Sequence, residues 1–136
     1  MSDKVNLEFY EISQRLHALR LPEVDMVVGI ARGGLLPASL VAHQLELPLH
    51  LIRVNYRDDD NKPCRAIPEL LQPLEFDFSG KRILLVDDVS VSGATFQIAR
   101  ELLSSATITT LACKGQADFV LFPEVAACIN WPWSLA

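Results

Sequence analysis

Residues 83–95 read ILLVDDVSVSGAT, and this stretch decides how the rest of the chain is interpreted. It opens with a short apolar run that predicts a fully buried strand, continues with two consecutive acids, and ends in a small, hydroxyl-rich turn before a helical pattern. Backbone N–H groups at such a turn lie at the positive end of the following helix, and Gly93 lets a ligand come close. The stretch therefore predicts a phosphate site at the end of a buried strand.

A second strand, loop and helix lie upstream. The run VDMVVGI at 24–30 predicts a buried strand, ARGG follows at 31–34, and apolar residues then recur at helical spacing to residue 45. Strands alternating with helices in this way predict an α/β fold, a single domain over residues 1–136 with a central, mainly parallel sheet flanked by helices. If strands 24–30 and 82–86 are central neighbours, the two loops that follow them face each other across one crevice.

The other elements are predicted from shorter signals. A first helix is expected to start at Asn6 as its cap and to end at Pro22, with one apolar face made of Phe9, Ile12, Leu16 and Leu19. Further strands are expected at 49–54, 107–113 and 118–122, and a helix follows residue 95. The stretch from 55 to 79 holds an acidic run and three prolines, which predicts a long loop with a short helical turn near 69–72.

Composition limits the classes of function. The 136 residues carry a net charge of -5 and are 50% hydrophobic, which predicts one folded domain and argues against general nucleic-acid binding. No apolar run is long enough to cross a bilayer and the polar start does not resemble a signal peptide, so a cytoplasmic protein is expected. The three cysteines and three histidines lack the spacing of a disulfide framework or a zinc site.

The stretch VDDVSVSGAT resembles the phosphoribosyl-pyrophosphate (PRPP) signature of type I phosphoribosyltransferases, with Ser92 where Thr is usual. The resemblance implies that fold, and it implies that Asp87 and Asp88 hold the ribose hydroxyls directly or through Mg²⁺. It also implies that the residues after them bind PRPP, chiefly its 5-phosphate: Ser90, Val91, Ser92, Gly93, Ala94 and Thr95.

The upstream stretch GIARGGLLPASLVAHQLELPL resembles the pyrophosphate loop of the same family and the helix after it. Arg32 is then expected to contact pyrophosphate, with Gly33 and Gly34 giving backbone access. The family's frequent cis peptide in this loop would fall at Ala31–Arg32. The resemblance runs from about Tyr10 to Trp133, but it is sharp only at 29–37 and 83–95.

The tail is similar to the bacterial xanthine-guanine branch of the family. In CKGQADFV and INWPWS, Lys114 and Trp133 match the residues that meet the purine 6-oxo group and stack on the base. An ammonium only donates hydrogen bonds, which favours a 6-oxo over a 6-amino group. Lys114 as a solvated residue, and the tryptophans as core or dimer-contact residues, remain alternatives. One position departs from the branch, because Val91 stands where 6-oxopurine members usually carry an acid near N7 of the base.

These observations predict Mg²⁺-dependent transfer of 5-phosphoribose from PRPP to a purine base, with a 6-oxopurine favoured. The expected partners are therefore PRPP and a nucleobase, with neither nucleic acid nor membrane, and the family tends to form homodimers or homotetramers. Two alternatives stay open. One is a PRPP- or nucleotide-binding regulator with little turnover, and the other is a phosphoribosyltransferase for adenine or a pyrimidine.

Overall fold

The computed structural model describes residues 5–55, 69–70 and 76–133. A six-stranded sheet has the order β4-β3-β2-β5-β6-β7, and β1 pairs separately with β8. All pairs are parallel except β3 with β4, which confirms the expected α/β fold with a mainly parallel sheet. The elements are β1 (Val5–Asn6), α1 (Phe9–Ala18), β2 (Met26–Ala31), α2 (Leu35–Leu45), β3 (Leu49–Asn55), β4 (Glu69–Leu70), β5 (Arg82–Ser90), α3 (Ala94–Leu102), β6 (Thr107–Gly115), β7 (Phe119–Val120) and β8 (Ile129–Asn130).

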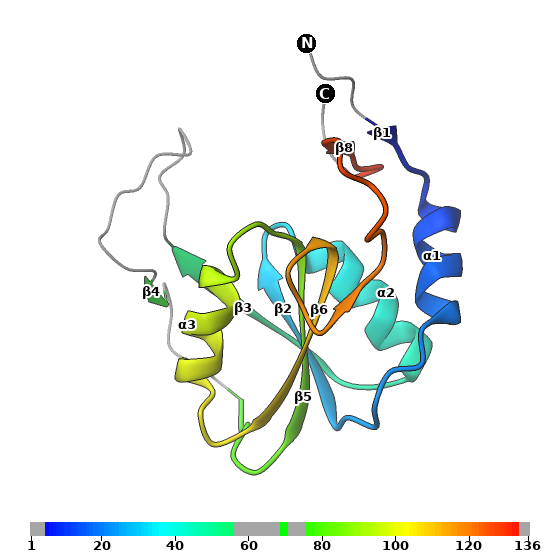
Figure 1. Cartoon of the computed structure of the whole chain (residues 1–136). Coiled ribbons are helices and arrows are strands. Elements are labelled where there is room, and N and C mark those ends of the chain that lie inside the picture. The colour runs from blue at the N-terminus through cyan, green and yellow to red at the C-terminus, as the bar shows by residue number, and fades with distance from the viewer. Residues whose placement is uncertain (1–4, 56–68, 71–75, 134–136) are drawn as a thin grey trace.

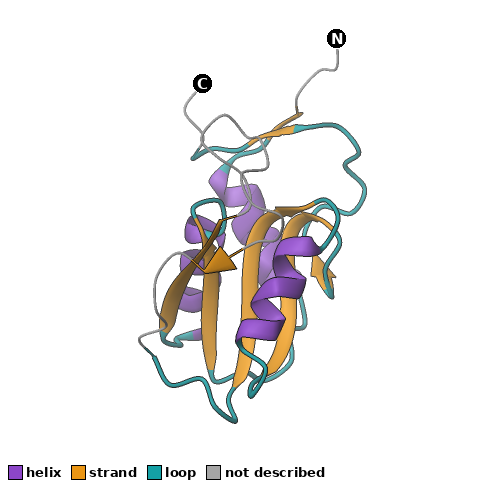
Figure 2. Ribbon diagram, turned by 90° about the vertical axis from the view of Figure 1, so that its left-hand side faces the viewer, coloured by secondary structure: helices purple, strands orange, loops and turns teal. Residues whose placement is uncertain are grey.

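Helices cover both faces of the sheet, with α1 and α2 on one face and α3 on the other (Figures 1 and 2). Alternate residues of the central strand β5 therefore enter different cores, because successive strand side chains point to opposite faces. Leu84 and Val86 belong to the core beneath α1 and α2, whereas Ile83 and Leu85 belong to the core beneath α3. Burial on both faces explains why these strands are continuous apolar runs.

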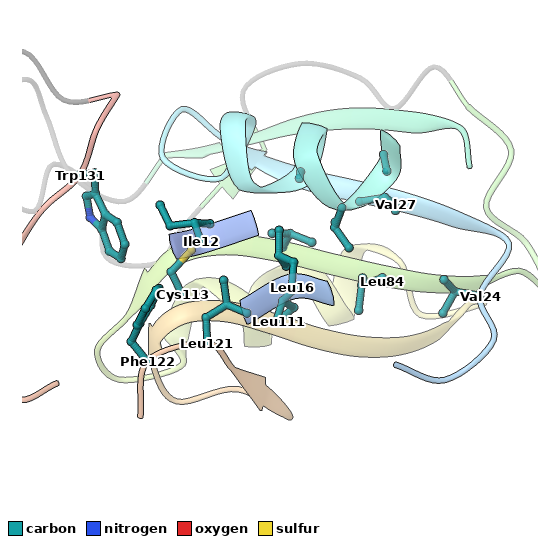
Figure 3. Close-up of a cluster of buried hydrophobic side chains, with 14 residues drawn as sticks. Ile12, Leu16, Val24, Val27, Leu84, Leu111, Cys113, Leu121, Phe122 and Trp131 are labelled. Carbon is teal, nitrogen blue, oxygen red and sulfur yellow. The ribbon is translucent and has the colours of Figure 1, made fainter. Parts of the chain in front are cut away.

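The core beneath α1 and α2 extends toward the C-terminal part of the chain (Figure 3). Ile12 and Leu16, one helical turn apart on α1, are completely buried and pack in this cluster with Leu111 and Cys113 of β6. Trp131 joins the same cluster from the chain beyond β8. Helix α1 therefore anchors the last described residues to the sheet.

The start of α1 differs from the expectation. Asn6 does not cap the helix, because it lies in β1 opposite Asn130, whose side-chain amide donates to the Asn6 side chain at 3.0 Å. The cap is Glu8, which forms a reciprocal capping box with Glu11. Phe9 also lies outside the buried face, with 44% of its surface exposed. Pairing between distant segments therefore moved the helix start by two residues.

Two further boundaries differ. Residues 69–70 form β4, antiparallel to β3, instead of the start of a helical turn, because they pair with the free edge of that strand. Strand β5 continues through both acids to Ser90, beyond the expected end at 86, because β6 pairs alongside it for its whole length. Most of the expected long loop, including Tyr56 and Arg57, lies outside the described residues. In the described part of the chain, no helix is long and apolar enough to span a membrane.

Candidate active site

The order of the sheet reverses between β2 and β5. The chain leaves β2 through α2 to reach β3 on one side, and leaves β5 through α3 to reach β6 on the other. Because β2 and β5 are parallel neighbours, with Gly29 opposite Val86, their carboxyl ends lie side by side. This confirms the predicted arrangement, in which the loops after the two strands meet where open α/β sheets bind ligands.

The loop after β2 contacts the carboxyl end of β5, where Gly33 meets Asp88. A β-carbon on Gly33 would overlap the Asp88 carboxylate, and one on Gly34 would overlap the carbonyl oxygens of Val86 and Ile30. Any larger residue at either position would push the loops apart, so glycine is required here for close approach. The peptide bond between Ala31 and Arg32 is cis, as the family resemblance implies. Arg32 itself is exposed beside this contact.

The two acids lie at the carboxyl end of β5, each partly buried. The Asp87 carboxylate accepts a hydrogen bond from the backbone N–H of Asp88 at 2.8 Å, and the Asp88 carboxylate accepts one from the N–H of Val89 at 2.7 Å. Burial raises the pKa of Asp87, and the neighbouring charge of Asp88 raises it further. A bound cation, or hydrogen bonds donated by hydroxyl groups, would therefore stabilise the ionised form of the two acids.

Residues 90–95, here called the phosphate loop, connect β5 to α3. Gly93 has a left-handed backbone (φ 81°) and precedes α3 as its N-cap, so the loop turns sharply into the helix. The Ser92 hydroxyl accepts from the N–H of Ala94 at 3.3 Å. Ser90 is buried, whereas Val91 is 81% exposed, an unusual value for a large apolar side chain. The N-terminus of α3 thus directly follows the loop that carries Val91.

Lys114 lies next to the acids, since it pairs with Val89 in the register of β5 and β6. Its ammonium donates to the carbonyl oxygens of Ala126 and Ala127, at 3.1 and 2.5 Å, and so ties β6 to the segment before β8. Trp133 stacks on Trp131, with ring centroids 5.2 Å apart and planes at 2°.

The ring centroids of Phe9, on α1, and Trp133 are 6.0 Å apart. Both base-site candidates therefore make contacts within the chain. These contacts agree with the structural alternative for the tryptophans and exclude a simply solvated Lys114.

A family model of the phosphoribosyl transferase domain matches residues 9–113, a range that contains both loops and the two acids. The chain belongs to the phosphoribosyltransferase family. The chain is similar along 98% of its length to the crystal structure of a purine phosphoribosyltransferase from Pyrococcus horikoshii Ot3, with 27% identity, a TM-score of 0.80 and 95% of that chain covered.

Curated relatives of the chain include xanthine-guanine and orotate phosphoribosyltransferases. A xanthine-guanine phosphoribosyltransferase from Ruegeria sp. is 32% identical over 81% of the chain and 68% of the relative. An orotate phosphoribosyltransferase from Sulfurisphaera tokodaii is 31% identical over 71% of the chain, which spans only 48% of that relative's length. These comparisons support the xanthine-guanine branch of the family and leave the acceptor base unassigned.

The paired acids Asp87 and Asp88 fit a hard divalent cation. Carboxylate oxygens are the ligands that Mg²⁺ prefers, and Mg²⁺ usually binds through one or two carboxylates together with water and substrate phosphates. Among the residues that the structure describes, no group of three or more acids, histidines and cysteines lies together. A cation beside Asp87 and Asp88 would also neutralise the repulsion that raises the pKa of Asp87.

One residue of the site was missed from the sequence. Gln116, two residues after Lys114, binds the phosphate loop through its backbone N–H, which donates to the Ser90 carbonyl at 2.7 Å, and through its side chain, which donates to the Val91 carbonyl at 3.1 Å. The signal that could have found it is the Gly–Gln pair at the end of a predicted strand, beside the acidic strand. Glycine at a strand end indicates that another backbone comes close.

Proposed function

We propose that the protein transfers 5-phosphoribose from PRPP to a 6-oxopurine base, releasing pyrophosphate and forming a nucleoside monophosphate. The contact between Gly33 and Asp88 carries this proposal, because it joins a candidate pyrophosphate loop to a candidate ribose-binding acid. In PRPP, the pyrophosphate and the ribose hydroxyls are carried by the same sugar ring, which fixes the distance between them. Two loops held in direct contact suit such a compact substrate better than two separate ligands.

The proposed chemistry needs positioning and charge rather than a covalent nucleophile. The C1–O bond to pyrophosphate breaks, the C1–N bond to the base forms, and the base loses the proton from that nitrogen. Asp87 and Asp88 hold the ribose hydroxyls, which fixes C1 between the leaving group and the base. Arg32 lies exposed at the loop beside Asp88, where a guanidinium stabilises the charge that develops on departing pyrophosphate. Mg²⁺, when bound, stabilises the same developing charge on the phosphate oxygens.

The class of the acceptor base is inferred from Lys114. An ammonium rewards a 6-oxo group and not a 6-amino group, and the similarity to xanthine-guanine relatives supports the same class of base. Two of the three N–H donors of the Lys114 ammonium bind Ala126 and Ala127, which leaves one donor for the base. Trp133 is proposed to stack on the base.

A pyrimidine acceptor is the second candidate, and two observations favour it. Orotate phosphoribosyltransferases are among the relatives at 31% identity or more. Val91, at the position of the N7-directed acid, is exposed and unable to exchange a proton. The valine therefore removes one reason for a purine while leaving the rest of the site unchanged.

The test is to incubate the protein with PRPP, Mg²⁺ and one free base at a time, and to follow pyrophosphate release and nucleotide formation. The panel contains guanine, xanthine, hypoxanthine, adenine and orotate. Release with 6-oxopurines alone supports the proposal, whereas release with orotate alone would assign the second candidate. Tight PRPP binding without transfer to any base would instead indicate a regulator.

The variant Val91→Asp sharpens this test. Restoring an acid is expected to raise the rate with 6-oxopurines by about tenfold or more, since general acid–base catalysis contributes roughly 10²–10⁴-fold. A matched variant, Val91→Asn, has the same shape without the acid and should not raise the rate. If Val91→Asp is slower with every base, the valine suits a different acceptor.

A further inference from the structure

Gln116 binds two consecutive carbonyl groups of the phosphate loop. Its backbone N–H donates to the Ser90 oxygen at 2.7 Å, and its side-chain Nε2 donates to the Val91 oxygen at 3.1 Å. Because a carbonyl oxygen only accepts hydrogen bonds, the side-chain amide has to present its NH₂ group to Val91. One residue outside the loop thus fixes the peptide planes on both sides of Val91.

The direction of these two carbonyls matters for binding an anion. A loop binds phosphate when its N–H groups face the ligand, and a carbonyl oxygen turned the same way would repel the phosphate oxygens. The carbonyls of Ser90 and Val91 are both held toward Gln116. The same peptide units must therefore direct their N–H groups, those of Val91 and Ser92, to the opposite side.

The backbone around Gln116 is shaped for this contact. Gly115 has a positive φ of 106°, and a β-carbon there would overlap the backbone of Ser90. Any other residue would push the segment away, so glycine brings Gln116 within reach of the loop. A β-carbon on Gly93, later in the loop, would lie 4.0 Å from the side-chain oxygen of Gln116.

We propose that Gln116 is a positioning residue that holds the phosphate loop in its anion-binding conformation and thereby sets the affinity for the 5-phosphate of PRPP and of the nucleotide product. This inference rests on the proposed function, since it assigns a ligand group to the loop. Gln116 acts through the backbone of Ser90 and Val91 and is not a catalytic residue.

The experiment measures binding by calorimetry for three ligands: PRPP with Mg²⁺, guanosine monophosphate, and pyrophosphate with Mg²⁺. Gln116→Met keeps the length of the side chain and removes only its hydrogen-bonding groups. Gln14→Met, at an exposed position of α1, is the matched control. Thermal unfolding of both variants verifies that the fold is intact.

We expect Gln116→Met to weaken PRPP and the monophosphate by about 3–10-fold, the effect of one lost hydrogen bond, and to leave pyrophosphate unchanged. The KM for PRPP should rise while kcat stays the same, because the bond acts equally in the ground and transition states. Gln116→Glu should weaken both 5-phosphate ligands further, since a carboxylate cannot donate and adds negative charge.

Two results would overturn the inference: unchanged binding of all ligands by Gln116→Met, or an equal loss for pyrophosphate, which would indicate a general structural role. If the unmodified protein binds neither PRPP nor the monophosphate, the proposed function fails and the inference falls with it. Binding by the unmodified protein, with no difference in the variant, rejects the inference alone.

Discussion

The site has two halves that are built in different ways. The half around Gly33 and Asp88 lies on neighbouring buried strands, and its loops meet through backbone and glycine contacts. The half around Lys114 and Trp133 depends on β1 and β8, a two-stranded sheet formed by segments more than 120 residues apart. The first half leaves no space for a β-carbon at Gly33 or Gly34. The second half is held by ring stacking and by hydrogen bonds from the Lys114 ammonium.

This difference indicates where specificity can change. In the first half, a side chain at Gly34 would press on the backbone of Ile30 in β2 and of Val86 in β5, and so alter the separation of these strands. A substitution in the second half alters stacking between rings or hydrogen bonds from one ammonium group. We therefore expect the PRPP half to be shared among relatives with different acceptors, while the half with Lys114 varies. The occurrence of orotate and xanthine-guanine relatives at similar identity agrees with this expectation.

The largest effect is expected for the double variant Asp87→Asn and Asp88→Asn. Losing both carboxylates should reduce turnover by about 10²–10³-fold, on the order of 3–4 kcal/mol of transition-state stabilisation. Asp77→Asn, at an exposed acid before β5, is the control and should retain full turnover. PRPP-dependent pyrophosphate release measures the effect, and unchanged release in the double variant would reject the role of both acids.

Gly33→Ala should have the next largest effect. The added methyl group displaces the Asp88 carboxylate or the loop, and overpacking of this kind costs about 1–3 kcal/mol, so kcat/KM should fall by about 10–10²-fold. Gly80→Ala is the control, because a β-carbon at Gly80 would meet open space; unlike Gly33, Gly80 has a positive φ, which alanine adopts only with strain. That variant should lose some thermal stability and keep its activity. Equal kcat/KM for Gly33→Ala and the unmodified protein would show that the loops need not touch.

Lys114→Met tests the second half of the site. Removing the ammonium should reduce the preference for 6-oxopurines over adenine by about tenfold and leave the KM for PRPP unchanged. Lys81→Met, at the opposite end of the sheet, is the matched control. Competition assays with guanine and adenine give the preference directly. A raised KM for PRPP in Lys114→Met would mean that the two halves are not separable.

The smallest effect concerns stability. The raised pKa of Asp87 means that its ionised form destabilises the ligand-free fold, so Asp87→Asn should stabilise the protein by about 1 kcal/mol at neutral pH. The gain should grow as the pH rises above about 4, where an unfolded-state Asp loses its proton. Thermal unfolding with a chelator present, at about pH 5 and pH 8, measures it.

Asp118→Asn is the control with the opposite sign. A hydrogen bond from the backbone N–H of Thr110 lowers the pKa of Asp118, with further help from Arg100. The charged form therefore stabilises the fold above the unfolded-state pKa, and this stability is lost as the pH falls. Asp118→Asn should destabilise at neutral pH and have less effect in acid. If both Asn variants shift stability in the same direction, the assigned electrostatics of Asp87 is wrong.

The first half of the site was predictable from the sequence because its signals are local. An apolar run, the acids and a glycine turn are contiguous, and the reversal of strand order was predicted on the condition, now confirmed, that the strands at 24–30 and 82–86 are neighbours. The cis bond at Ala31–Arg32 was expected only through the family resemblance. The roles of Arg32, Asp87 and Asp88 in binding and catalysis stay predictions.

The features that sequence reasoning missed depend on pairing between distant segments. Asn6 looked like a helix cap, but its pairing partner lies at the far end of the chain. Residues 69–70 pair with the edge of β3, which overrode the local preference for a turn. Gln116 gained its contact only because β5 and β6 align Ser90 with Gly115. None of these partners is visible within a local window.

The pairing of β1 with β8 also imposes an order on assembly during translation. Residues 5–6 leave the ribosome well before their partners at 129–130 are synthesised. Strands β2, β3, β5 and β6, by contrast, are complete once residue 115 has emerged. A nascent chain can therefore form the sheet that carries both loops before the segment that holds Trp131 exists. Until then the face of α1 that Trp131 covers stays open to solvent.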